Sequence, residues 1–349
     1  MTFSDHIHYF KDLFKDRCLT AEPDLQRYGS DETEDLCFPP QLVLKPETTE
    51  EVSGIMKYCN QHEIPVTPSG ARTGLSGGAL PIKGGVLLSM ERFHSILDID
   101  EKNHQVTTEP GVITQVLQEA VREKGLFYPP DPASKGSCFI GGNVAENSGG
   151  PKAVKYGVTL DYVLNLEVVL PNGEVIWTGA NVLKNATGYN LTQLIVGSEG
   201  TLAVVTKIVL KLISHPTHDA LLLVPFFSAE QACEAVAAIF RAGITPSGLE
   251  FMERDALVWA QEFTQDFTIK VEDNHEAHLL IEVDGNDAAV IMQECESIVA
   301  VLEEFETDEV LFADSTAQKD GLWSLRRKVS EAVKAQSVYK EEDTVVPRY

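Results

Sequence analysis

The sequence lacks a basic excess, a long apolar run and a secretory leader. Its 349 residues carry 53 acidic and 28 basic side chains, which give a formal net charge of −25. A nucleic-acid surface needs a basic stripe and an anionic membrane attracts basic segments, so this charge argues against both partners. No apolar run approaches the roughly 20 residues of a membrane span, and the N-terminal stretch has no apolar core of a signal peptide. We therefore expect a cytoplasmic protein without a transmembrane segment.

Closely spaced metal-ligand or redox pairs are also missing. The six cysteines are scattered and form no CxxC motif: Cys18, Cys37, Cys59, Cys138, Cys233 and Cys295. Reduced thiols are the expectation for such cysteines in a cytosolic protein. Four histidines stand singly, without the spacing of metal ligands: His215, His218, His275 and His278. The sequence therefore predicts no metal site within this chain.

The composition and the local patterns indicate a globular α+β protein of two domains. The chain is 43% hydrophobic and 23% charged, as soluble globular proteins are. In its first part, Thr48-x-x-Glu51 predicts a helix start and Asn172-Gly173 predicts a hairpin. A helix is expected over 114–124, with four residues facing inward: Val116, Leu117, Ala120 and Val121.

The pattern changes near His215-Pro216. Beyond it, expected strands at 220–227, 246–252, 278–284 and 310–313 alternate with expected helices at 229–241, 254–263 and 287–305. This alternation predicts a smaller, ferredoxin-like α+β layer. We therefore predict one domain over residues 1–214 and a second over residues 215–349.

The first candidate for chemistry is a glycine-rich loop. Residues 65–85 read PVTPSGARTGLSGGALPIKGG, with six glycines, after a short apolar strand. Backbone N–H groups free of side-chain crowding can converge on an anion in such a loop. The loop matches neither the GxGxxG fingerprint nor the GxxxxGK[ST] phosphate loop. On its own it is equally typical of a surface turn.

Two further blocks share this character. Residues 129–157 read PPDPASKGSCFIGGNVAENSGGPKAVKYG, and residues 188–205 read GYNLTQLIVGSEGTLAVV. So many small residues indicate a backbone that passes close to a flat or anionic ligand. Long loops in compact domains are also usually functional.

The three blocks together resemble the FAD-binding domain of the vanillyl-alcohol oxidase / p-cresol methylhydroxylase (PCMH) superfamily of flavoproteins. Within it the sequence is most similar to the FAD-linked D-2-hydroxyacid dehydrogenases, over roughly residues 40 to 349. That group includes the glycolate oxidase D subunit, D-lactate dehydrogenase and D-2-hydroxyglutarate dehydrogenase. The resemblance implies a PCMH-type FAD-binding domain of two α+β subdomains, followed by a ferredoxin-like substrate (cap) domain.

The resemblance also assigns residues to the cofactor. The first block would hold the FAD pyrophosphate through its amides: Pro68, Ser69, Gly70, Ala71, Arg72, Thr73, Gly74, Leu75, Ser76 and Gly78. The second would line the isoalloxazine and ribityl chain: Pro130, Asp131, Ser134, Cys138, Gly141, Gly142, Ala145, Asn147, Ser148 and Gly149. The third would meet the adenine end and the dinucleotide body: Glu199, Gly200 and Val204. The first loop has no histidine, and the neighbours of Cys138 do not indicate a covalent link, so we expect non-covalent FAD.

A fourth site lies near the C-terminus. A carboxylate substrate needs a cation, ideally a guanidinium. By charge alone, Arg326, Arg327 and Lys328 are equally typical of a solvated helix face. The resemblance assigns Arg326 and Lys340, with Ser330 beside them, to the carboxylate of a 2-hydroxy acid.

One segment of the family is absent. Members carry a later H-x-G-D-G-N-x-H segment whose histidines bind a divalent metal and supply the general base. No such segment occurs here, and the sequence stops at Val346-Pro-Arg-Tyr349. We therefore expect a substrate domain truncated at its C-terminus. A divalent metal would then belong only to the full-length protein, and this fragment would turn over poorly alone.

The sequence thus predicts FAD-dependent oxidation of a D-2-hydroxy acid (glycolate, D-lactate or D-2-hydroxyglutarate class) to the 2-oxo acid, with hydride passing to flavin N5. Two alternatives stay open. One is an enzyme of the same superfamily that acts on a neutral alcohol or a UDP-sugar, and the other is a non-catalytic FAD-binding subunit of a multi-protein oxidoreductase. The electron acceptor, and whether the protein has partner subunits or forms a homodimer, also stay open.

Overall fold

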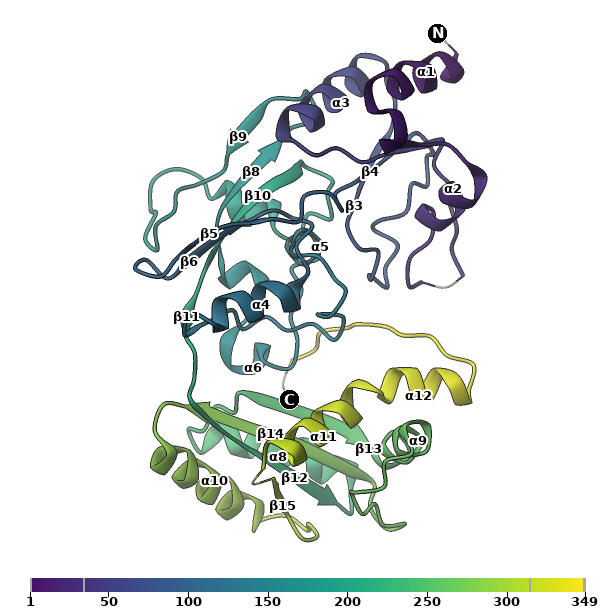
Figure 1. The fold of residues 1–349 in the computed structure, drawn as a ribbon. Coiled ribbons are helices and arrows are strands. Elements are labelled where there is room, and N and C mark those ends of the chain that lie inside the picture. The colour runs from purple at the N-terminus through teal and green to yellow at the C-terminus, as the bar shows by residue number, and fades with distance from the viewer. Residues whose placement is uncertain (1, 34, 314, 348–349) are drawn as a thin grey trace. The chain divides into compact units, whose positions relative to one another are not determined.

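The computed structural model describes residues 2–33, 35–313 and 315–347 (Figure 1). The chain folds as two compact units. The first holds the residues up to Gly150 together with Val158–His215, and the second holds Pro151–Gly157 together with the residues from Pro216 onward. The chain therefore passes between the units three times. None of the described helices is both long and apolar enough to cross a membrane.

The first unit begins with a four-stranded sheet in the order β1-β2-β4-β3. Its strands are β1 (Cys18–Leu19), β2 (Leu42–Leu44), β3 (Val66–Ser69) and β4 (Val86–Ser89). The helices here are α1 (Phe3–Phe14), the 3-10 turn η1 (Lys15–Arg17), α2 (Glu22–Tyr28) and α3 (Thr49–Gln61). The Thr48 side chain accepts from the Glu51 N–H and caps α3, as predicted. The α3 face of Val52, Ile55 and Cys59 is buried in the core with Phe10 of α1.

A second, five-stranded sheet runs in the order β5-β6-β10-β8-β9, with all neighbours antiparallel. Its strands are β5 (Ile96–Asp100), β6 (Gln105–Thr108), β8 (Val163–Val169), β9 (Val175–Trp177) and β10 (Val204–Lys211). Gly173, at φ 82°, lies in the turn that joins β8 to β9, where the sequence predicts a hairpin. These two sheets are the two α+β subdomains that were expected.

Shorter elements complete the first unit: α4 (Thr114–Arg122), α5 (Ile140–Glu146), η2 (Thr159–Asp161), α7 (Leu191–Ile195) and the paired strands β7 (Leu126–Phe127) and β11 (Ile213–Ser214). In α4 the buried stripe is Thr114, Leu117 and Val121. Val116 is 49% exposed, so its predicted inward orientation was wrong. The buried residues are spaced three and four positions apart, so they form one narrow stripe along the helix. Val116 lies outside this stripe.

The second unit is a four-stranded antiparallel sheet in the order β13-β14-β12-β15. The strands are β12 (His218–Phe226), β13 (Gly248–Glu253), β14 (Ala277–Gly285) and β15 (Leu311–Ala313). Counted in chain order this is 2-3-1-4, the strand order of a ferredoxin-like layer, which confirms the prediction. The helices are α6 (Ala153–Tyr156), α8 (Ala229–Arg241), α9 (Arg254–Thr264), α10 (Ala288–Leu302), α11 (Thr316–Arg327) and α12 (Val329–Gln336).

The two faces of this sheet are covered by different helices (Figure 1). Along β12, Leu222 and Val224 belong to the core shared with α8 and α10. Their neighbours Leu221 and Leu223 belong to the core on the other face, where α9, α11 and α12 pack. This alternation follows from the two-residue period of a strand.

The segment Pro151–Gly157 is bound to β14 by charges. Lys155 Nζ lies 2.7 Å from Asp284 Oδ1, and the Tyr156 hydroxyl donates to the same oxygen at 2.7 Å. Lys152 forms ion pairs with both Glu282 and Asp284. Both carboxyl groups are buried, at 6% and 4% exposure. Burial by itself would raise the pKa of Asp284, but the Lys152 charge and the hydrogen bonds from Lys155 and Tyr156 bring it below its ordinary value.

Candidate functional site

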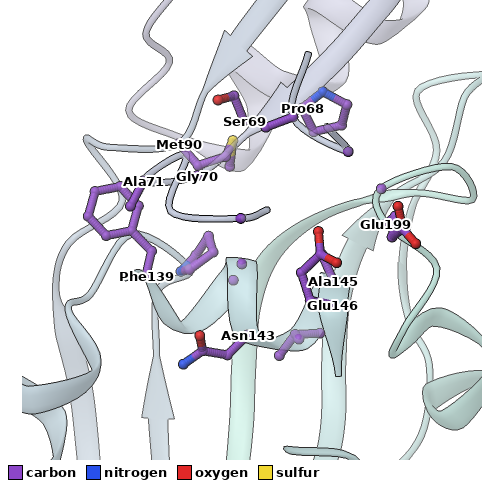
Figure 2. Close-up of a pocket in the computed structure, with 18 of the residues that line it drawn as sticks. Pro68, Ser69, Gly70, Ala71, Met90, Phe139, Asn143, Ala145, Glu146 and Glu199 are labelled. Carbon is purple, nitrogen blue, oxygen red and sulfur yellow. The ribbon is translucent and has the colours of Figure 1, made fainter. Parts of the chain in front are cut away.

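A cleft in the first unit is lined by all three glycine-rich blocks (Figure 2). It encloses about 1110 Å³, counting the part open to solvent. Pro68, Ser69 and Gly70 lie on one wall, and α5 with Asn143 and Glu146 forms the facing wall. Most of the residues predicted to bind a cofactor line this cleft: Pro68, Ser69, Gly70, Ala71, Arg72, Thr73, Gly74, Gly78, Ser134, Cys138, Gly141, Gly142, Ala145, Ser148, Glu199, Gly200 and Val204.

The glycines let the three blocks approach one another. A Cβ at Gly70 would lie 3.8 Å from the Gly142 Cα, which joins the first block to the second. A Cβ at Gly200, where φ is +70°, would lie 3.2 Å from the Pro68 ring, which joins the third block to the first. At Gly141 a Cβ would lie only 2.5 Å from the Pro110 ring. Gly141 is therefore required by packing against Pro110, whereas Gly142 has open space where its Cβ would be.

The loop after β3 presents unused backbone donors. Among the described residues, none of the backbone N–H groups from 71 to 79 donates a hydrogen bond within the protein. Ser69 is 3% exposed, and its hydroxyl has no partner in the described part of the chain. A buried hydroxyl such as that of Ser69 is normally hydrogen-bonded. A run of free N–H groups with an unpaired hydroxyl at its start fits an anionic ligand.

Arg72 brings a positive charge to the same loop. Its backbone is left-handed, with φ 59°, and its guanidinium lies 4.4 Å from the centre of the Tyr28 ring. Burial lowers the pKa of Arg72 below its ordinary value, but an arginine remains a cation at neutral pH. A stacked, partly desolvated guanidinium favours a phosphate or a carboxylate in the cleft.

Three acids line the cleft as well. A Cβ at Gly78 would lie 3.0 Å from Glu199 Oε2 and 3.2 Å from Glu146 Oε1, so both carboxyl groups face this glycine. Burial, and then the charges of Glu199 and Asp31, raise the pKa of Glu146. In Figure 2 the Glu146 and Glu199 side chains lie on one side of the cleft and Phe139 on the other. Carboxylate oxygens accept hydrogen bonds, so this side suits hydroxyl or amino groups of a ligand rather than its phosphates.

The base of the cleft is held by a small polar cluster. Asn143 Nδ2 donates to Thr114 Oγ1 at 2.6 Å, and Cys138 Sγ lies 3.2 Å from the same hydroxyl. All three residues are buried. The third block is fastened to α5 by backbone bonds from the Gly197 N–H to the Val144 carbonyl and from Glu199 to Ala145, each 2.9 Å. The cleft therefore has a fixed floor.

Six predicted cofactor residues do not line the cleft in this structure: Leu75, Ser76, Pro130, Asp131, Asn147 and Gly149. Three of them carry structural contacts, one being Asp131, whose carboxylate lies 4.0 Å from Lys135 Nζ. Asn147 ends α5 at φ 53°, and its side chain accepts from the Leu160 N–H at 2.8 Å. The Pro130 carbonyl accepts from Gln118 at 3.0 Å.

Sequence reasoning missed a second set of lining residues: Asp31, Ala79, Met90, Pro110, Phe139, Asn143, Val144, Glu146, Ile195, Ser198, Ala203 and Val205. The residues of this set that lie inside the three blocks could have been found by predicting every residue of each block as a possible lining residue. Asp31, Met90 and Pro110 lie outside the blocks, and no local pattern marks them. Only the folded arrangement brings them to the cleft.

The residues predicted to bind a substrate carboxylate lie in the second unit. Arg326 is in the last turn of α11 and forms an ion pair with Glu250. The Ser330 hydroxyl, in the first turn of α12, donates to Glu341 at 3.1 Å. Lys340 is exposed and pairs with Glu342. In the described part of the chain, Arg326, Ser330 and Lys340 form no hydrogen bond with one another. The described residues also contain no group of three or more His, Cys, Asp or Glu side chains that is placed to hold a metal ion.

Two family models match the chain. Residues 40–179 match the model described as the FAD binding domain, and residues 215–349 match the C-terminal domain of FAD linked oxidases. The first unit thus carries the FAD-binding domain of a flavoprotein. The solved structure of p-cresol methylhydroxylase with substrate bound matches with a TM-score of 0.75 at 20% identity, over 94% of this chain and 69% of that chain. This likeness shows a PCMH-type fold.

Named relatives share more sequence. The chain is 40% identical over 312 residues to the D-lactate dehydrogenase of Anaerostipes hadrus, covering 88% of this chain and 66% of that protein. It is also 40% identical over 328 residues to the glycolate oxidase subunit GlcD of Bacillus subtilis, covering 92% and 68%. The chain belongs to the FAD-linked oxidase family. It spans about two thirds of the length of these relatives.

Proposed function

We propose that this chain binds FAD non-covalently in the cleft of the first unit and oxidises a D-2-hydroxy acid to the 2-oxo acid. The observation that carries the proposal is the set of backbone N–H groups at residues 71–74, which have no hydrogen-bond partner among the described residues and line the cleft where three glycine-rich blocks meet. Relatives named as a D-lactate dehydrogenase and a glycolate oxidase subunit support the substrate class. The proposed division of labour is FAD binding by residues 1–214 and substrate binding by residues 215–349.

The residues of the cleft fit the parts of FAD. The loop N–H groups and Arg72 suit the pyrophosphate, since free amides and a guanidinium both bind phosphate. Gly141, Gly142 and Ser148 form a wall with little side-chain bulk, which suits the flat isoalloxazine and the ribityl chain. Glu199, Gly200 and Val204 would meet the adenine end. When bound, FAD supplies the acceptor for hydride, and the protein supplies orientation and charge.

Non-covalent attachment is proposed from the state of Cys138, a cysteine that lines the cleft. Cys138 is only 3% exposed, and its sulfur is engaged with Thr114. In the second unit, Arg326 would bind the substrate carboxylate with Ser330 and Lys340 nearby. A cation at the last turn of α11 is also favoured by the helix dipole.

A paired substitution tests the FAD site. Gly142→Ala adds a methyl group where no protein atom lies within 4 Å, on the wall of the cleft. Because alanine is up to about 1 kcal/mol better than glycine inside a helix, the ligand-free variant should melt no lower than wild type. Its Kd for FAD, measured by quenching of flavin fluorescence, should rise at least about tenfold, since the methyl group occupies ligand space.

Gly54→Ala is the matched control. Gly54 lies in α3, exposed and also with no atom within 4 Å of an added Cβ, so this variant should gain similar stability and keep the wild-type Kd for FAD. Wild-type protein that is colourless and has no affinity for FAD contradicts the proposal. So does equal FAD binding by the two variants.

The substrate class is tested on the FAD-loaded protein without oxygen. D-lactate, glycolate or D-2-hydroxyglutarate should bleach the flavin absorbance slowly, because this chain is expected to turn over poorly alone, and Arg326→Ala should remove this response. A neutral alcohol that bleaches the flavin while the acids do not would show that the acid assignment is wrong.

A further inference from the structure

Arg326 is held by one particular acid. Its Nε donates to Glu250 Oε2 at 2.6 Å, and its Nη2 lies 2.5 Å from the same oxygen. The side chains are 32% exposed for Arg326 and 15% exposed for Glu250. Glu250 lies on β13 opposite Leu280 of β14, on the sheet face that packs against α11. A rigid strand therefore presents the carboxylate to the helix.

A second contact fixes the rotation of α11. Trp323 lies one turn before Arg326, and its indole N–H donates to Glu282 Oε2 at 2.8 Å. The indole also packs against β13, where a Cβ on Gly248 would lie 3.2 Å from the ring. Residues three apart share a helix face. Trp323 and Arg326 are thus anchored to neighbouring strands from the same face, which leaves the guanidinium little freedom to turn.

The anchoring leaves part of the guanidinium unused. Arginine has two edges that can bind a carboxylate, one formed by Nε with Nη2 and one by Nη1 with Nη2. Glu250 occupies the first edge. Among the described residues, Nη1 has no hydrogen-bond or ion-pair partner. A substrate carboxylate could therefore bind at the Nη1 side without displacing Glu250.

We propose that Glu250 is a positioning residue for substrate binding: it holds Arg326 by the Nε/Nη2 edge and directs Nη1 toward the carboxylate of the 2-hydroxy acid. The inference rests on the proposed function, in which Arg326 binds that carboxylate. A side chain that is already ordered loses less conformational freedom when the substrate binds, and so contributes more to affinity. Loss of Glu250 would leave a largely buried guanidinium unpaired and free to change rotamer.

The test compares Glu250→Ala and Glu250→Gln in the FAD-loaded full chain. Calorimetric titration with pyruvate, a non-reacting 2-oxo acid, gives Kd without relying on turnover, and anaerobic flavin reduction by D-lactate gives the apparent KM. Glu250→Ala should raise both about tenfold, with flavin content unchanged. Glu250→Gln keeps an oxygen that accepts from Nε and Nη2, and should recover at least half of the loss.

Asp219→Asn is the matched control. Asp219 of β12 pairs with Lys319 of α11 at 2.8 Å, which is another strand-to-α11 ion pair, two turns before Arg326. This variant should keep the wild-type Kd for pyruvate. In an Arg326→Ala background, Glu250→Ala should have no further effect on pyruvate binding, because nothing remains to be positioned.

Three results would overturn the inference. The first is that Glu250→Ala binds pyruvate as tightly as wild type or more tightly, since Glu250 would then be a bystander or a competitor. The second is that Glu250→Ala still raises the Kd for pyruvate in the Arg326→Ala background, because that effect would be structural. The third is wild-type protein that holds FAD but binds neither pyruvate nor D-lactate, which overturns the inference and the acid assignment together. The flavin content of the protein tests the proposed FAD site separately.

Discussion

His278 has an unusual position for a histidine. It lies on β14 with 0% exposure, opposite Pro225 and Met252 of the neighbouring strands. Neither ring nitrogen has a hydrogen-bond partner in the described part of the chain. Burial, together with the charges of His275 and Arg254, lowers the pKa of His278 to about 4. The imidazole is therefore neutral in the folded protein over most of the accessible pH range.

This predicts a stability loss in mild acid. The unfolded chain takes up a proton at this histidine near pH 6.5, whereas the folded protein does so only near pH 4. The free energy of unfolding should therefore fall as the pH drops through this window, by about 2 kcal/mol between pH 7.5 and pH 5. Urea unfolding of wild type and His278→Leu at both pH values measures it, and the variant should lack this part of the loss.

His218→Gln is the control for the acid effect. His218 begins β12 and is exposed, so its replacement should leave the wild-type pH response intact. An unchanged pH response in His278→Leu would show that other groups cause the acid sensitivity.

At the scale of the elements, the second unit was the more predictable from sequence. Its strands and helices alternate in hydrophobic period, which placed the four strands close to where the structure has them. In the first unit, Thr48 and Asn172-Gly173 marked local structure correctly because capping and tight turns depend on neighbouring residues alone. The cleft walls could be placed in the three blocks because the blocks are dense in small residues and resemble an FAD-binding domain.

What could not be predicted depends on distant partners. The second glycine-rich block contains Lys152, Lys155 and Tyr156. From the sequence alone, these three residues are typical of a solvated polar surface. Their partners, Glu282 and Asp284, lie about 130 residues later on β14. No local pattern carries that pairing. For the same reason the sequence pointed to Arg326 but not to Glu250, which reaches it across 76 positions.

The segment Pro151–Gly157 gives a prediction at this scale. Lys155→Met removes one cation from Asp284, whose side chain is only 2% exposed. Breaking a buried ion pair leaves an uncompensated charge, and with Lys152 and Tyr156 still in place we expect a loss of about 2 kcal/mol in the free energy of unfolding. Urea unfolding measures the loss. Lys270→Met, at a side chain 86% exposed, is the control and should cause no measurable change; equal stability of the two variants contradicts the prediction.

At the scale of the whole molecule, each unit has its own core, but the second is discontinuous in sequence. Its main part begins at Pro216, and Pro151–Gly157 is contributed from within the first unit's sequence. A fragment of residues 216–349 therefore lacks Lys152 and Lys155, the cations that pair with Glu282 and Asp284.

The absence of Pro151–Gly157 from this fragment predicts that removing the two acids will change the melting temperature in opposite directions in the fragment and in the full chain. In the full chain, the double substitution Glu282→Gln and Asp284→Asn should lower the melting temperature, because it removes paired charges. In the 216–349 fragment the same substitution should raise it, because there it removes buried charges without cations. Circular dichroism melting of the four proteins measures this. Shifts of the same sign in both backgrounds would contradict it.

The three crossings of the chain also constrain how such proteins can be recombined. A chimaera that exchanges the proposed substrate-binding half with a relative by one junction at residue 215 would leave the recipient's Lys152 and Lys155 facing a foreign strand. A functional exchange needs two further junctions, at 150 and 157, immediately beside the glycine-rich wall of the cleft. Substrate preference in this architecture is therefore expected to be inherited together with part of the cofactor block rather than as a separate cassette.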